Sequence, residues 1–334
     1  MIKRPTVIVV GAGASFSLEF PLGIGLVTSI SQKLKFGRDW QGRIEGDQRL
    51  FQSMRLATES LGVSDDELFE QSIEISEGLA LAESIDNYVH THQGNLLVPI
   101  ISKLAIGLFI LDAEYKCDLR TGHSFKSSKI PPQFWVSSFC RLHFTKSISG
   151  QLDEIFDNVA IVCFNYDRNI QRSIQIGLAN YFRLSDSDAT NLTAKLRVFH
   201  PYGSLGEILT SNKLPYGTAP TAESIFQSSK GIRTFTEGPM SAKFSTDVSG
   251  LLEWAQSIAF LGFGFGRLNM DALGNVPRTG NIKKVFGTAL GMSEPNRTNL
   301  DWSLENQFRA SNSKPLVSCK AEDLLQHFSM ELFD

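Results

Sequence analysis

Asn165 and His200 are two residues of types suited to chemistry, and each directly follows an apolar run of the chain. Imidazole has the side-chain pKa nearest neutral pH and can serve as a general base, while a carboxamide can hold a hydroxyl group or a water molecule. Asn165 is also suited to N-cap a following helix, and Asp167 to stand in the first turn of that helix. His200, before Pro-Tyr-Gly, is also typical of a hydrogen-bonded turn.

A glycine-containing loop near the start is the second candidate feature. The run Thr6–Val10 leads into Gly-Ala-Gly-Ala-Ser, which predicts a buried strand entering a tight turn. Gly11 and Gly13 can take positive φ and carry no Cβ, so a ligand can approach the backbone. A helix starting near Ser15 would direct its free N–H groups toward a pyrophosphate. A structural strand-to-helix turn is the alternative.

This loop matches the dinucleotide fingerprint G-x-G-x-x-G only in part, because Phe16 occupies the place of the third glycine. No acidic residue follows a clear second strand about 20 residues further on, where a dehydrogenase would need it. A conventional dehydrogenase is therefore disfavoured.

Strand and helix patterns alternate along much of the chain. We expect an α/β fold with a Rossmann-like parallel sheet, helices on both faces and a mainly helical insertion. Residues 1–34 and 151–334 form the expected discontinuous core, and residues 35–150 the insertion. The candidate motifs all follow expected strands, including Gly262 and Phe263, whose segment is also compatible with a plain turn. Ligands bind at the carboxyl ends of strands in such sheets.

Several further elements are expected from local patterns. Ser64-Asp65-Asp66-Glu67 is a capping box that predicts a helix start, and Leu96–Tyr115 predicts a helix with Pro99 in its first turn. Residues 204–250 are expected to be irregular, and Lys283–Thr288 to be the last strand. A loop as long as 204–250 is usually functional or mobile.

Composition excludes several classes of protein. The chain has 334 residues and a net charge of −3, which does not suggest a general nucleic-acid binder. Its four cysteines include no C-x-x-C pair, and its histidines lack metal-ligand partners at suitable spacing, so we expect no metal. The longest apolar stretch, Leu96–Leu111, is shorter than the roughly 20 residues a membrane span needs. We therefore expect a cytoplasmic protein with no membrane span.

The order of these motifs resembles the sirtuin-like family, the sirtuin-related NAD hydrolases of bacterial anti-phage defence. In that family the loop matching Gly11, Ala12, Gly13 and Ser15 binds the NAD phosphates. The resemblance implies that Asn165 reaches the nicotinamide ribose and positions the attacking water, with Asp167 in the same cofactor-binding motif. It implies that His200 is a general base or a partner of the ribose hydroxyls. It assigns Gly262 and Phe263 to the adenosine half.

A further motif, Ser84-Ile85-Asp86, resembles a recurring signature of the family. We leave open whether Asp86 stabilises its helix or orders the site. The chain departs from true sirtuin deacylases, which carry a zinc module with paired cysteines and an Asp-Phe-Arg where this chain has Leu22-Gly23-Ile24. Both departures argue against deacylation.

The resemblance implies an NAD glycohydrolase that releases nicotinamide and ADP-ribose as a toxic effector of anti-phage defence. It implies a homo-oligomer working beside a HerA-type ATPase. The alternatives are a non-catalytic subunit that binds NAD or ADP-ribose, and an NAD-dependent deacylase or ADP-ribosyltransferase. Cleavage of the nicotinamide–ribose bond passes through an oxocarbenium-like sugar, as in glycoside hydrolysis. Phe16, Phe20 and Tyr202 are candidate walls for the departing ring.

Overall fold

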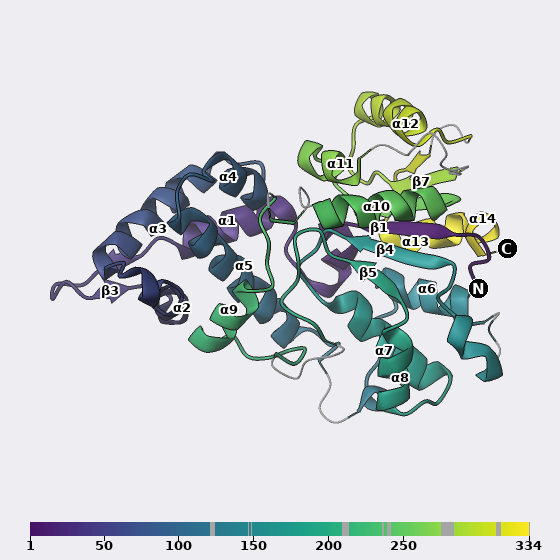
Figure 1. Cartoon of the computed structure of the whole chain (residues 1–334), viewed down its shortest axis with the longest axis horizontal. Coiled ribbons are helices and arrows are strands. Elements are labelled where there is room, and N and C mark those ends of the chain that lie inside the picture. Colours follow the sequence, from purple (N-terminus) through teal and green to yellow (C-terminus); the bar gives the residue numbers. More distant parts are fainter. Residues whose placement is uncertain are drawn as a thin grey trace.

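The computed structural model describes residues 1–120, 124–145, 147, 149–208, 214–235, 237–238, 242–274, 284–311 and 315–333. The strands are β1 (Thr6–Val10), β2 (Gly37–Arg38), β3 (Ile44–Glu45), β4 (Val159–Cys163), β5 (Arg197–Phe199), β6 (Ser257–Leu261), β7 (Lys284–Thr288) and β8 (Leu316–Val317). Figure 1 shows them beside the helices.

The α-helices are α1 (Gly23–Lys33), α2 (Gln48–Thr58), α3 (Asp65–Leu79), α4 (Ile85–Thr91), α5 (Leu97–Lys116), α6 (Trp135–Phe144), α7 (Asn169–Tyr181), α8 (Asp186–Thr193), α9 (Ala222–Ser229), α10 (Ala242–Trp254), α11 (Arg267–Leu273), α12 (Glu294–Phe308), α13 (Ala321–His327) and α14 (Ser329–Phe333). The described residues also contain the 3-10 helices η1 (Ala12–Leu18), η2 (Glu59–Leu61), η3 (Phe125–Ser127) and η4 (Ser149–Glu154).

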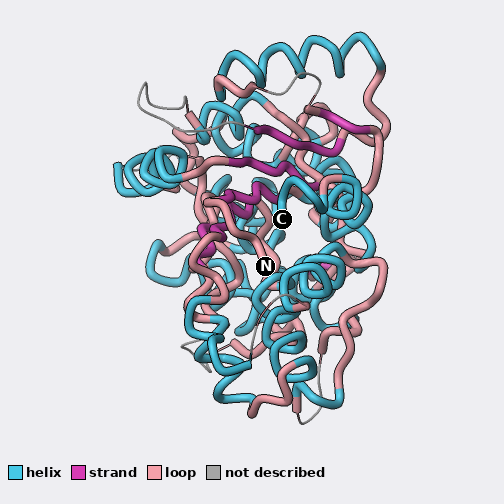
Figure 2. Tube along the Cα trace, turned by 90° about the vertical axis from the view of Figure 1, so that its right-hand side faces the viewer, coloured by secondary structure: helices cyan, strands magenta, loops and turns pink. Residues whose placement is uncertain are grey.

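Six strands form one parallel sheet in the order β5-β4-β1-β6-β7-β8. Numbered along the chain, this is 3-2-1-4-5-6, the strand order of Rossmann folds. The first strand is central, because Thr6 pairs with Val159 on one side and with Ser257 on the other. The order therefore reverses between β1 and β6, which makes their carboxyl ends the topological switch point. Figure 2 shows the strands of this sheet among the helices.

The central strands owe their position to their composition. Every residue of β1, β4 and β6 is buried, and most are apolar or β-branched. Strands buried on both faces are typical of parallel sheets covered by helices, because crossover helices pack against each face. The expected α/β, Rossmann-like fold is confirmed.

A group of helices lies beside the sheet, on the left of Figure 1. It includes α1 to α5, and α9 packs there against α2 and α5 although it comes much later in the chain. The capping box at Ser64 is confirmed, since the Ser64 side chain and Glu67 each accept the hydrogen bond that the motif requires. Helix α5 begins at Leu97, with Pro99 in its first turn as expected.

The expectation of an irregular segment over 204–250 is wrong for part of its length. Helix α9 lies within it, and α10 begins at Ala242, before the segment ends. Helix α9 is short and rich in serine, which lowers its local helix signal. Thr221 caps α9, and the helix gains its stability by packing on α2 and α5.

The C-terminal elements also differ from expectation. Strand β8 pairs with β7, so β7 is not the last strand. Helix α12 begins at Glu294, with Pro295 in its first turn. Two residues are too few for a sequence pattern to identify β8, and Lys283 lies outside the described residues.

Candidate functional site

The two glycine loops meet at the switch point of the sheet. Gly11 N–H donates to the Leu261 carbonyl at 3.0 Å, and Gly13 N–H donates to the Gly262 carbonyl at 2.9 Å. These bonds continue the pairing of β1 and β6 beyond the strand ends. The loop after β1 and the loop after β6 therefore form one structural unit.

Glycine is required in this unit for a different reason from the expected one. Gly11 has φ of −120° and lies in the extended region, and Gly13 lies within a 3-10 helix. It is Gly262 that has positive φ, at 56°. A Cβ on Gly11 would lie 2.7 Å from the Gly262 carbonyl oxygen, and a Cβ on Gly13 would lie 2.9 Å from it. The missing side chains make room for the backbone of the neighbouring loop.

The helix expected near Ser15 is also different. Residues Ala12–Leu18 form η1, whose C-cap residue Glu19 has a φ of 62°, and α1 begins only at Gly23. A 3-10 helix is shorter and less regular than an α-helix, so its N-terminus carries a smaller aligned dipole. η1 nevertheless places Ser15 in a buried position facing the loop that follows β4.

Ser15, Asn165 and Asp167 form a buried polar cluster that joins these loops. Asn165 Nδ2 donates to the Gly11 carbonyl at 3.1 Å and to Ser15 Oγ at 3.2 Å. Ser15 Oγ donates to Asp167 Oδ2 at 2.9 Å. The N-cap of α7 is Arg168, so Asn165 does not cap that helix. The cluster brings together sequence-predicted residues from β1 and β4.

Asp167 has a structural contact as well, because its Oδ1 accepts the Asn169 N–H at the start of α7. Burial raises the pKa of Asp167 to about 6, although the hydrogen bonds from Asn169 and Ser15 act in the opposite direction. The negative charge of Glu114 raises this pKa further. Asp167 is thus a carboxyl that titrates nearer to neutral pH than an exposed one.

His200 lies at the end of β5, next to this cluster. Its Nδ1 is 3.0 Å from the Asn165 carbonyl oxygen, and its Nε2 is 3.1 Å from the amide nitrogen of Gln171. Because a carbonyl can only accept, this contact assigns the proton to Nδ1. Burial lowers the pKa of His200 below the ordinary 6.5. The imidazole is therefore neutral at pH 7.

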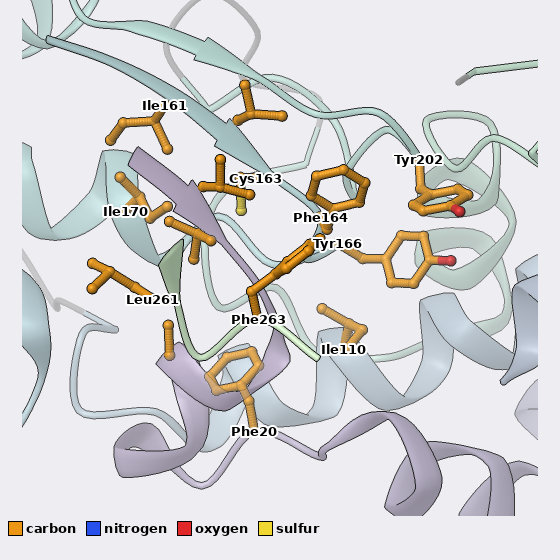
Figure 3. Close-up of a cluster of buried hydrophobic side chains, with 14 of the residues drawn as sticks. Phe20, Ile110, Ile161, Cys163, Phe164, Tyr166, Ile170, Tyr202, Leu261 and Phe263 are labelled. Atoms are coloured by element: carbon orange, nitrogen blue, oxygen red, sulfur yellow. The ribbon is translucent and has the colours of Figure 1, made fainter. Parts of the chain in front are cut away.

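Aromatic side chains line the same end of the sheet, as Figure 3 shows. Phe164 packs edge-on against Phe263, with ring centroids 5.0 Å apart, and lies 6.1 Å from the ring of Tyr202. Phe20 is also buried, whereas Phe16 is 61% exposed. Phe20 and Tyr202 thus join the buried aromatic cluster, and Phe16 points to solvent.

Asp86 reaches the site from the group of helices beside the sheet. The Tyr166 hydroxyl donates to Asp86 Oδ1 at 2.6 Å, which links α4 to the loop between Asn165 and Asp167. Burial raises the pKa of Asp86 to about 6, partly offset by this hydrogen bond. Ser84 caps α4, while the Asp86 carboxylate contacts the loop. These contacts favour the ordering role for Asp86.

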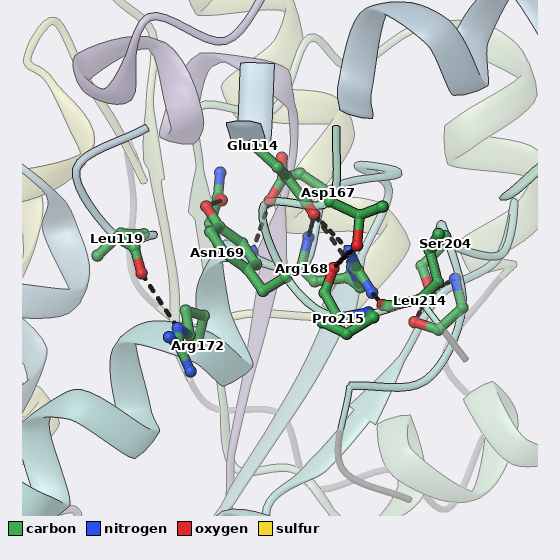
Figure 4. A network of polar contacts seen from close by, with 12 residues as sticks. Glu114, Leu119, Asp167, Arg168, Asn169, Arg172, Ser204, Leu214 and Pro215 are labelled. Carbon is green, nitrogen blue, oxygen red and sulfur yellow. Dashed lines mark hydrogen bonds and ion pairs between the residues drawn. The ribbon is translucent and has the colours of Figure 1, made fainter. Parts of the chain in front are cut away.

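Sequence reasoning missed a buried ion pair next to the cluster, shown in Figure 4. Arg168 donates to both carboxylate oxygens of Glu114, at 3.1 and 2.5 Å, and to the Leu214 carbonyl at 2.5 Å. Both side chains are fully buried. Glu114 was detectable as a carboxylate within the mostly apolar helix 97–116, and Arg168 as a charge directly after the motif at Asn165.

Two further polar residues were missed, and both lie on α7. Gln171 contacts His200, and Asn169 accepts the Tyr216 hydroxyl at 2.6 Å. Their positions become apparent only when α7 and β5 are placed side by side. Neither residue forms a sequence motif that would have singled it out.

The described part of the chain contains no group of three His, Cys, Asp or Glu side chains that could hold a metal ion. His123 lies outside the described residues. Among the described residues, no single helix is long and apolar enough to cross a membrane. The pair η1 and α1 reaches that length and composition together, but the two helices are bent by 74° at the break between them.

The candidate site thus brings together Asn165, Asp167, His200, Ser15 and the glycine loops at one edge of the sheet. Its residues come from the ends of four neighbouring strands. A scan against models of known protein families found no match to the chain, and a search of curated proteins found none either.

Proposed function

We propose that the chain is an NAD glycohydrolase, which cleaves the nicotinamide–ribose bond of NAD and releases nicotinamide and ADP-ribose. One observation carries the proposal. Asn165 and His200 lie at the ends of adjacent strands, joined through the Asn165 carbonyl, beside the loop Gly11–Ser15 at the switch point of the sheet. Open α/β sheets bind dinucleotides at such a switch point.

Cleavage of the nicotinamide–ribose bond does not depend on a general acid. Nicotinamide leaves as a neutral ring from a cationic one, so the leaving group needs no proton. The sugar develops oxocarbenium character, and a water molecule must attack it, as in other glycoside cleavages. A residue that positions water and a base that accepts its proton are therefore the main requirements.

Asn165 and His200 are the residues we assign to these roles. Asn165 Nδ2 is held by the Gly11 carbonyl and Ser15, which fixes the amide plane, so we assign its oxygen to the ribose hydroxyl or the water. His200 is neutral at pH 7 because burial lowers its pKa, and a neutral imidazole is the form that accepts a proton. Phe164, Tyr202 and Phe263 provide an apolar surface next to them.

The test follows nicotinamide and ADP-ribose by chromatography after NAD is added to the purified protein. We expect turnover by the wild type and a loss of about 10² to 10⁴ in rate for Asn165→Ala and for His200→Ala, the usual scale for positioning and acid–base groups. Asn158→Ala is the matched control, because Asn158 binds the Lys3 carbonyl at the opposite end of β4. Near-normal hydrolysis by His200→Ala would show that its assignment is wrong.

A non-catalytic NAD or ADP-ribose binding subunit is a second candidate. It is favoured by one observation: both nitrogens of His200 already have partners within the protein. This candidate predicts that calorimetry detects ADP-ribose binding, weakened in Asn165→Ala, while no nicotinamide is released under any assembly state.

A further inference from the structure

We propose that Gln171 is a positioning residue for His200: its amide donates a hydrogen bond to Nε2 and holds the imidazole with that nitrogen as the lone-pair atom. The meaning of this pair for catalysis rests on the proposed function. The pair itself is a property of the folded chain and can be tested separately.

The hydrogen bonds of His200 define its tautomer. The Asn165 carbonyl oxygen lies 3.0 Å from Nδ1 and can only accept, so Nδ1 carries the proton. In the neutral ring Nε2 then has a lone pair and needs a donor. The Gln171 amide nitrogen is 3.1 Å away and supplies that donor.

The oxygen of the Gln171 amide allows this residue to pair with His200 in both protonation states. Gln171 Oε1 is buried and has no partner in the described part of the chain. When Nε2 takes up a proton it becomes a donor, and the amide can turn over to present Oε1 to it. Gln171 can therefore form a hydrogen bond with both protonation states of His200. When the amide turns over, its nitrogen takes the place of Oε1 as the atom without a partner.

Charged groups near His200 are engaged elsewhere. On the β4 loop, Asp167 is bound to Ser15 and Asn169; on α7, Arg168 is paired with Glu114, and Arg172 donates to the Leu119 carbonyl. Tyr202, which follows His200, donates to Asn269. Burial is the main cause of the lowered pKa of His200, and the Asn165 carbonyl opposes it. The neutral amide of Gln171 is thus the side chain that meets Nε2.

Gln175 provides a matched control one turn further along α7. It is buried, its Nε2 donates to Thr190 at 3.2 Å, and its Oε1 also lacks a partner among the described residues. The replacements Gln171→Glu and Gln175→Glu therefore make the same change on the same helix. They differ in that Gln171 contacts His200 and Gln175 contacts Thr190.

The experiment is an NMR titration of the full-length protein that follows the ring nitrogens of His200, assigned by comparison with His200→Ala. In the wild type we expect the neutral ring to carry its proton on Nδ1. In Gln171→Glu we expect the pKa of His200 to rise by about one unit or more, because a carboxylate next to Nε2 favours the imidazolium. In Gln175→Glu we expect a smaller change.

Two results would overturn the proposal. The first is a neutral wild-type ring that carries its proton on Nε2. In that tautomer Nε2 has no lone pair, so the Gln171 amide nitrogen could not donate a hydrogen bond to it. The other is an equal shift in the two glutamate variants, each checked for folding by circular dichroism. If Gln171→Glu does not fold, Gln171→Ala and Gln175→Ala are compared instead, and the pKa of His200 should rise only in Gln171→Ala, because Nε2 then loses the donor that favours its neutral form.

The NAD assay connects the pair to catalysis. A base with a raised pKa is already protonated, and so inactive, at a higher pH. The acid limb of the pH–rate profile of Gln171→Glu should therefore move to higher pH by as many units as the pKa of His200 rises in the titration. Gln175→Glu should leave that limb in place. If the titration behaves as expected and neither the wild type nor any variant releases nicotinamide in any assembly state, the pair is supported and the proposed function fails.

Discussion

At the scale of single residues, burial controls the protonation of the candidate site. It raises the pKa of Asp167 and of Asp86 to about 6 and lowers the pKa of His200. In each case burial disfavours the charged form, and it outweighs the hydrogen bonds that act against it. The pKa values of the two carboxyl groups and of the imidazole therefore lie closer together than the ordinary pKa values of these groups do.

Asp167→Asn should stabilise the protein at pH 8 and have much less effect near pH 4. The folded-state pKa is raised from 3.8 to about 6, so the folded state binds the proton more tightly. The stability contributed by Asp167 is therefore present below pH 3.8 and is lost as the pH rises to about 6. Two pKa units correspond to about 3 kcal/mol, the upper limit of the gain.

Urea unfolding of wild type and Asp167→Asn at several pH values measures this difference. Asp153→Asn is the control, because Asp153 is exposed and its pKa is lowered by Lys195, so the same replacement should give no such gain at pH 8. A stability difference for Asp167→Asn that does not change with pH would contradict the assignment of a raised pKa.

At the scale of elements, contacts from three helices fix the loop that follows β4. Helix α4 reaches it through Asp86 and Tyr166, and η1 through Ser15 and Asn165. Helix α5 reaches it through Glu114, whose Oε1 accepts the Arg168 backbone N–H at 3.1 Å as well as the side chain. The loop that carries Asn165 is therefore held by segments far away in sequence.

The buried Glu114–Arg168 pair gives a prediction at this scale. Glu114→Ala leaves a buried guanidinium unpaired and should cost about 3–5 kcal/mol of unfolding free energy. The double variant Glu114→Met, Arg168→Met should cost less than Glu114→Ala, because no charge stays buried. Chemical denaturation of the wild type, Glu114→Ala and the double variant measures these differences in unfolding free energy.

Asp153→Ala is the control, because it breaks an exposed ion pair and should leave stability unchanged. A double variant that is less stable than Glu114→Ala would contradict the argument.

The contact between the glycine loops gives another prediction. A Cβ at Gly13 would lie 2.9 Å from the Gly262 carbonyl, closer than such contacts allow, so Gly13→Ala should destabilise the fold by about 1–3 kcal/mol. Gly25 lies in α1 with open space around its Cβ position, and Gly25→Ala should stabilise by about 0.5 kcal/mol. Thermal unfolding distinguishes them. Equal stability of both variants would show that the loops can separate at little cost.

The sequence predicted the parallel sheet and several residues of the polar cluster, but not the contacts between elements that hold the cluster together. Apolar runs identified the main strands, and polar residues after those runs identified Asn165, Asp167 and His200. The runs do not give the strand order, so the contact of Gly13 with Gly262 and its steric cause were not predictable. Gln171 and Glu114 were missed because each acts on a residue from a different element.

At the scale of the whole molecule, we proposed an enzyme whose candidate site lies at one edge of the six-stranded parallel sheet. The resemblance of its motifs to effectors that act beside a HerA-type ATPase suggests that activity is controlled by assembly. An enzyme that drains NAD without control would harm its own host. We therefore extend the proposal to a role in anti-phage defence in which an oligomer or a partner switches the site on.

This extension predicts that hydrolysis depends on assembly. Specific activity should rise with protein concentration, or on addition of the partner ATPase, in step with the mass measured by light scattering. The Asn165→Ala protein should assemble equally well and remain inactive, which separates assembly from chemistry. Dilute monomer that hydrolyses NAD as fast as the assembled protein would refute control by assembly.

The central position of β1 has a consequence for biosynthesis. The ribosome makes Thr6–Val10 first, but its partners Val159–Cys163 and Ser257–Leu261 emerge much later. Until then the first strand has no edge to join, and such long-range pairing is slow and exposes the chain to aggregation. The loop at Gly11 acquires its neighbour at Gly262 only after most of the chain has been translated. If the chain hydrolyses NAD as proposed, the site cannot act before the residues up to Gly262 have been synthesised.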